Sequence, residues 1–130
     1  GVDFAAPTGT PVYAAGNGVI EYAKRNGGYG KYIRIRHNSS YKTAYAHLNS
    51  FKKGISKGTR VNQGQIIGYV GSTGRSTGPH LHYEVIYQGK AINPMKMKLP
   101  SGKILEGKEL IKFTELSKTI YSNFLFHLFE

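Results

Sequence analysis

The chain has 130 residues, 39% of them hydrophobic, which fits one compact domain with a core of its own. The formal net charge is +11, but the basic residues are scattered from Lys24 to Lys118 without a dense basic helix or an RNA-binding motif, so nucleic acid is not an expected partner. The absence of cysteine excludes disulfides and thiolate metal sites, and no apolar run approaches the ~20 residues of a membrane span.

Residues 1–100 have the pattern of a β-rich domain. The 17 glycines and 10 tyrosines favour short strands joined by turns. Ile33 and Ile35 alternate with Tyr32, Arg34 and Arg36, which predicts a strand with one buried face. The strand candidates in chain order are residues 11–14, 19–23, 31–37, 43–48, 65–70, 80–87 and 91–92. Strands this short and evenly spaced predict a mainly β fold, an open antiparallel sheet or barrel-like core.

The pattern changes after Pro94. From Glu106 onward, the pattern has three- and four-residue steps at Leu110, Phe113, Ser117, Ile120 and Phe124, all apolar except Ser117, which predicts one amphipathic C-terminal α-helix. We therefore divide the chain into a domain at 1–100 and a C-terminal helical extension at 101–130.

His80 and His82 stand on either side of Leu81 in a predicted strand. A strand places residues i and i+2 on the same face, roughly 6.6 Å apart, whereas on a helix they diverge by about 200°. Both imidazoles then face the same way while Leu81 points into the core. One ring could bind a metal while the other reaches a neighbouring water or substrate atom. The alternative is a pair of surface histidines.

Two further residues belong with this pair as candidates. His47 ends another predicted strand, and Asp3 lies between apolar residues near the start of the chain. A carboxylate in such a place is either a turn or cap residue or a ligand, and its position alone leaves both open. We expect His37, at a strand end, to be structural and His127 to be incidental. Glu84 shares a strand face with His82 and is either a partner of an imidazole or a surface carboxylate.

Three motifs together resemble the lysostaphin-type, or LytM-like, zinc metallopeptidases. They are Gly-Val-Asp-Phe-Ala-Ala-Pro, then Tyr-Ala-His-Leu, then Gly-Arg-Ser-Thr-Gly-Pro-His-Leu-His-Tyr-Glu-Val, and they occur in the family's order within residues 1–97. The resemblance implies a lysostaphin-type β core in a LytM-like domain at 1–100. It also implies zinc-dependent hydrolysis of peptidoglycan stem peptides or cross-links, by D,D-endopeptidase and also D,D-carboxypeptidase activity.

The resemblance assigns roles to four residues. Asp3 and His82 match zinc ligands, while His47 and His80 match histidines that flank the water bound to zinc. A neutral imidazole there can take a proton from the attacking water, and we expect His80 to be this base because strand geometry fixes it beside His82. His47 would orient the water or stabilise the transition state. We also expect Gly28, Tyr29 and Gly30 to line a substrate groove.

One ligand that the resemblance implies is not in the chain. The family has a histidine four positions before its aspartate, which here falls two residues before Gly1. Zinc in such a site takes three protein ligands and a water, so we expect this chain, as written, to bind zinc weakly or not at all. We expect a domain truncated at its start, whose longer parent is a competent enzyme with an upstream regulatory or inhibitory segment and a targeting segment that has been removed.

The expected partner is peptidoglycan, and the expected location is the periplasm or cell envelope, as an exported protein. The Asn93-Pro94 boundary and the helix expected after it, together with the high lysine content, make the chain resemble the Gram-negative cell-shape-determining members. A basic groove would suit the carboxylates of stem peptides. One alternative is a LytM-like domain that activates cell-wall amidases without catalysis. Another is a carbohydrate- or nucleic-acid-binding β domain, which would leave the histidine set unexplained.

Overall fold

The computed structural model describes residues 1–92, which form an antiparallel sheet of nine strands and one short 3-10 turn. This confirms the predicted mainly β, antiparallel fold, while the helix predicted from Glu106 lies outside the described residues. Within residues 1–92, no helix is long and apolar enough to cross a membrane. The elements are β1 (Val2–Ala5), β2 (Pro11–Tyr13), β3 (Gly18–Arg25), η1 (Gly27–Tyr29), β4 (Lys31–Arg36), β5 (Tyr41–Phe51), β6 (Arg60–Val61), β7 (Ile66–Val70), β8 (His80–Tyr87) and β9 (Lys90–Ile92).

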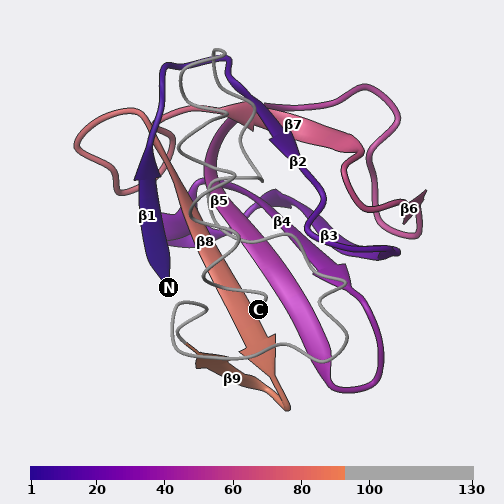
Figure 1. Cartoon of the computed structure of the whole chain (residues 1–130). Helices are drawn as coiled ribbons and strands as arrows, with labels where there is room; N and C mark the ends of the chain where they lie inside the picture. Colours follow the sequence, from indigo (N-terminus) through magenta and orange to yellow (C-terminus); the bar gives the residue numbers. More distant parts are fainter. Residues whose placement is uncertain (93–130) are drawn as a thin grey trace, which may run out of the picture.

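The main sheet has the strand order β1-β8-β5-β4-β3-β6, so the N-terminal strand lies beside the strand that carries His80 and His82 (Figure 1). β1 pairs with the first half of β8, from His80 to Tyr83, and β9 pairs with its second half, from Val85 to Tyr87. Every pairing is antiparallel. The register of β1 against β8 fixes which residues of the two strands face each other at the site.

Strand β5 changes partners along its length. As far as Ala46 it pairs with β8, and from Leu48 to Phe51 it pairs with β7. β7 in turn pairs with β2, so this smaller ribbon crosses one face of the main sheet (Figure 1). His47 lies at the point where the change occurs.

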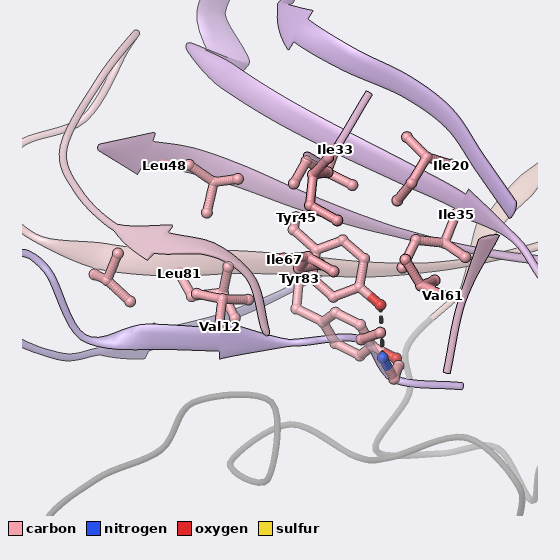
Figure 2. Close-up of a cluster of buried hydrophobic side chains, with 14 of the residues drawn as sticks. Val12, Ile20, Ile33, Ile35, Tyr45, Leu48, Val61, Ile67, Leu81 and Tyr83 are labelled. Carbon is pink, nitrogen blue, oxygen red and sulfur yellow. Dashed lines mark hydrogen bonds between the residues drawn. The ribbon is translucent and has the colours of Figure 1, made fainter. Parts of the chain in front are cut away.

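The core fills the space between the main sheet and the β2–β7 ribbon. Ile20, Ile33 and Leu48 of the main sheet point toward Val12 and Ile67 of the ribbon (Figure 2). These side chains are at most 1% exposed. Burying an aliphatic side chain of this size contributes roughly 1.5–3 kcal/mol, so this layer holds the ribbon on the sheet.

The predicted strands recur in the structure with boundary shifts of up to three residues, but β1 and β6 were not predicted. The prediction of one buried face in β4 is incomplete. Ile33 and Ile35 are fully buried as expected, yet Tyr32 on the opposite face is only 3% exposed. Tyr32 packs in a second cluster with Ala44 and Ala46, because these small β5 residues leave room for its ring.

Candidate active site

Asp3 and His82 lie opposite each other in the pairing of β1 with β8. The distance between Asp3 Oδ1 and His82 Nδ1 is 2.7 Å, and His80 Nε2 lies 3.6 Å from the same carboxylate oxygen. The Asp3 side chain is 66% exposed, whereas the two histidine side chains are about one fifth exposed. Asp3 is therefore a strand residue rather than a turn residue, and its carboxylate faces the histidine pair.

The alternation of β8 places His80 and His82 on one face. Leu81 between them is fully buried in the core, as predicted. His80 Nδ1 lies 2.8 Å from the carbonyl oxygen of Gly78. Because a carbonyl can only accept a hydrogen bond, Nδ1 carries the proton in this contact, and Nε2 of the neutral ring keeps its lone pair.

His47 joins the site from β5, at the change of strand partner. Its φ is 62°, a left-handed conformation that is uncommon outside glycine. Nδ1 donates a hydrogen bond to the carbonyl oxygen of Thr73 at 2.8 Å. Its ring centre lies 4.8 Å from that of His80 and 6.0 Å from that of His82. Burial lowers the pKa of His47, which favours the neutral ring with an available Nε2 lone pair.

Glu84 holds the other side of the His82 ring. Its Oε2 lies 2.8 Å from His82 Nε2, and Tyr29 donates its hydroxyl hydrogen to the same oxygen at 3.2 Å. The Tyr29 ring stacks on the His82 ring at 6.0 Å between centres. The hydrogen bond to Glu84, and then that to Asp3, raises the pKa of His82, while the bond from His82 lowers the pKa of Glu84. Of the two roles considered from the sequence, the structure places Glu84 in contact with an imidazole.

Two loops border an open pocket beside these residues. The pocket has a volume of about 320 Å³ and is lined by Gly28, Tyr29, His47, Arg75 and His82. The loops meet where the backbone N–H of Arg75 donates to the carbonyl oxygen of Gly28 at 2.8 Å. Gly28 and Tyr29 were expected beside a groove. Gly30, expected there too, is buried, and a Cβ added to it would lie 2.4 Å from the Thr73 carbonyl carbon.

The structure thus brings together the four residues that the sequence singled out, Asp3, His47, His80 and His82. His37 lies apart from them, with its ring nitrogens 2.8 Å from the Asn17 carbonyl oxygen and 2.6 Å from the Thr43 hydroxyl. His127 lies outside the described residues.

Sequence reasoning missed Arg75 and Thr73. Both lie in the polar loop before His80, and Arg75 also stands in the third family motif, but neither signal assigned them a role.

Two side chains of the site fit the zinc ion that the resemblance implies. Within residues 1–92, no three His, Asp or Glu side chains are arranged to hold a metal ion. Asp3 and His82 nevertheless present an oxygen and a nitrogen to each other, and both are donor types that zinc accepts. These residues fit two of the three protein ligands of a zinc site.

Comparison with known proteins decides the family. Residues 1–94 match the profile of Peptidase family M23. This chain belongs to peptidase family M23. The match includes the three motifs and every residue that lines the pocket, so it confirms the resemblance to lysostaphin-type peptidases.

Relatives of this M23 domain include bacterial cell-wall enzymes. The DD-carboxypeptidase/endopeptidase Mpg of Neisseria meningitidis is 49% identical over 82% of this chain, and the peptidoglycan DD-endopeptidase ShyA of Vibrio cholerae is 42% identical over 92%. The chain spans only 24% and 27% of their respective lengths.

Solved structures show the same fold. The crystal structure of a zinc-containing peptidase from Vibrio cholerae has a TM-score of 0.73 and 45% identity, covering 77% of this chain and 30% of that one. The catalytic domain of lysostaphin from Staphylococcus simulans has a TM-score of 0.68 and 38% identity, covering 73% of this chain and 74% of that one.

Proposed function

We propose that this M23 domain catalyses zinc-dependent hydrolysis of peptide bonds in peptidoglycan stem peptides or cross-links. The reaction is that of a D,D-endopeptidase, with D,D-carboxypeptidase activity as a second reaction of the same site. The observation that carries the proposal is the convergence of Asp3, His82, His80 and His47 in one cluster beside the pocket, which His47 and His82 line. The names of the relatives support the substrate class. Because peptidoglycan lies in the cell envelope, we place the activity there, in the periplasm of a Gram-negative cell.

In this proposal, Asp3 and His82 would be two ligands of the zinc ion, since Asp3 Oδ1 and His82 Nδ1 already face each other. The family resemblance implies a third, a histidine four positions before Asp3. Bound zinc supplies Lewis-acid activation of the scissile carbonyl and of a water molecule. Because His82 Nε2 is hydrogen-bonded to Glu84, Nδ1 is the ring atom that would be available to the metal.

His80 transfers the proton of the attacking water, and His47 orients that water. His80 Nε2 accepts a proton from the attacking water and returns it to the leaving amine, while the Gly78 carbonyl keeps the ring oriented through Nδ1. His47 stays neutral and accepts a hydrogen bond from the water at Nε2, because burial lowers its pKa and Thr73 holds its Nδ1 proton. The two backbone carbonyls thus fix both catalytic tautomers.

The experiment compares two forms of the chain that differ in one side chain. One form carries the dipeptide His-Ala before Gly1, and its control carries Ala-Ala, so only the first has a histidine four positions before Asp3. We expect about one zinc per chain in the histidine form and much less in the control. Chromatography of cross-linked muropeptides should show monomer release only by the histidine form.

A zinc-loaded histidine form that leaves every muropeptide intact would contradict the proposal. Stimulation of a cell-wall amidase by that same form would instead favour the non-catalytic activator.

A further inference from the structure

Arg75 brings a positive charge to the pocket that the proposed hydrolysis does not use. Its exposed side chain lines the pocket together with His47 and His82. A Cβ added to Gly28 would lie 3.7 Å from Arg75 Cβ and 3.9 Å from its Cζ. The guanidinium therefore lies against the backbone of Gly28, where a peptide that enters the pocket would meet it.

The loop that carries Arg75 is fixed to the rest of the site. Thr73 accepts a hydrogen bond from the Lys31 backbone N–H at 3.0 Å and donates one to the Leu48 carbonyl oxygen at 2.7 Å, both through its hydroxyl. The carbonyl oxygen of Thr73 accepts a hydrogen bond from His47 Nδ1. A Cβ added to Gly74 would lie 2.3 Å from the Gly30 nitrogen, so the two loops touch through their backbones. Arg75 is thus set at a defined place relative to the catalytic histidines.

Residues 1–92 contain three carboxylate side chains, and each already has partners. Asp3 and Glu84 contact the two ring nitrogens of His82, and Glu21 pairs with Arg34 and Lys42. Within the part of the chain that the structure describes, Arg75 therefore has no carboxylate to pair with. An arginine that lines a pocket without such a partner is suited to an anionic group of the ligand, because its guanidinium binds a carboxylate through two parallel hydrogen bonds.

We propose that Arg75 determines specificity by binding a free carboxylate of the peptide substrate near the scissile bond. The inference rests on the proposed function, since stem peptides supply both the scissile bond and free carboxylates. Arg75 then selects the substrate through its positive charge. The residues that act in hydrolysis are Asp3, His82, His80 and His47.

The test measures binding, so that it does not depend on cleavage. Synthetic stem peptides in which each carboxylate is replaced in turn by a carboxamide are titrated into the full chain, with calorimetry as the readout. One carboxamide should weaken binding roughly 10–100-fold, the effect of losing a charge-assisted hydrogen-bonded pair. Arg75→Gln should weaken binding of the parent peptide to the same extent and remove the difference between that carboxamide and the parent.

Arg60→Gln is the matched control, because Arg60 is exposed on β6 and does not line the pocket. It should bind all the peptides as the unmodified chain does. In the His-Ala form, Arg75→Gln should raise KM and leave kcat almost unchanged. The inference is overturned if no peptide binds, if no carboxamide weakens binding, or if Arg75→Gln retains the full preference for the carboxylate. Muropeptide cleavage that continues in any of these cases would leave the proposed function intact.

Discussion

Asp3 and His82 make a 2.7 Å contact although 79 positions separate them in the chain. The contact exists because β1, only four residues long, pairs with β8 in a register that sets Asp3 directly opposite His82. A shift of one residue would turn the Asp3 side chain to the other face of the sheet. The chemistry of the pocket therefore depends on the docking of a short N-terminal strand.

The first prediction separates the proposed catalytic histidines, His80 and His47, from the proposed zinc ligand His82. In the His-Ala form, His80→Ala and His47→Ala should each lower kcat by about 10²–10⁴-fold, the usual contribution of a positioned acid or base. Both variants should keep their zinc, measured by elemental analysis, whereas His82→Ala should lose it. Loss of zinc from His80→Ala would show that His80 is a ligand and would refute the assigned roles.

The second prediction concerns the support of His82. Glu84→Gln should weaken zinc affinity roughly 10–100-fold, because the carboxylate that orients the ring and raises its basicity is lost. Competition with a chromophoric chelator measures this in the His-Ala form. Glu21→Gln is the control, because Glu21 pairs with Arg34 and Lys42 and lies outside the site. The zinc affinity of this variant should equal that of the unmodified His-Ala form. Equal affinities for the two variants would remove Glu84 from the metal site.

The third prediction tests the contact between the two pocket loops. Gly30 has a φ of 65°, and an added Cβ would lie 2.4 Å from backbone atoms of Thr73, so Gly30→Ala must displace one loop. Gly58→Ala places a Cβ on a residue with a φ of 93°, with no atom within 4 Å of it, so it should lose only about 1–2 kcal/mol of unfolding free energy from backbone strain. Gly30→Ala should lose more and should also bind substrate peptides more weakly, which denaturant unfolding and calorimetry would show.

The fourth prediction concerns the stability of the fold at acid pH. Burial lowers the pKa of His37 in the folded protein, and its hydrogen bond to the Asn17 carbonyl only partly opposes this. The unfolded chain then binds the proton more readily, so His37 lowers the free energy of unfolding as pH falls below about 6.5. Urea unfolding at several pH values should show a smaller loss at acid pH for His37→Gln than for the unmodified chain. A loss of equal size in both would contradict this. Comparing the two chains also cancels the opposite contribution of His82, whose pKa is raised.

The sequence predicted the parts of the site that follow from local periodicity. The placement of His80 and His82 on one face needs only the alternation of a strand, and the buried Leu81 confirms it. Asp3 was different, because four residues are too few for a periodic signal, and only the family resemblance connected it to His82. Tyr32 was assigned to an exposed face because the small neighbours that accommodate it, Ala44 and Ala46, lie on another strand.

The pocket itself could not be predicted from local pattern. Arg75 reaches it only because Gly30 and Gly74, 44 positions apart, allow two loops to touch through their backbones. The left-handed conformation of His47 is equally non-local, since it arises where β5 exchanges one partner strand for another. Such features depend on contacts between distant segments, which a strand pattern does not encode.

The most direct test of the central claim is the metal dependence of cross-link cleavage by the His-Ala form. Cleavage of a purified cross-linked muropeptide dimer is followed before chelation, after removal of zinc, and after zinc is restored. Our account predicts that cleavage stops on chelation and returns with about one zinc per chain. Cleavage that continues at full rate in the metal-free protein, or none at all in the fully loaded protein, would contradict it.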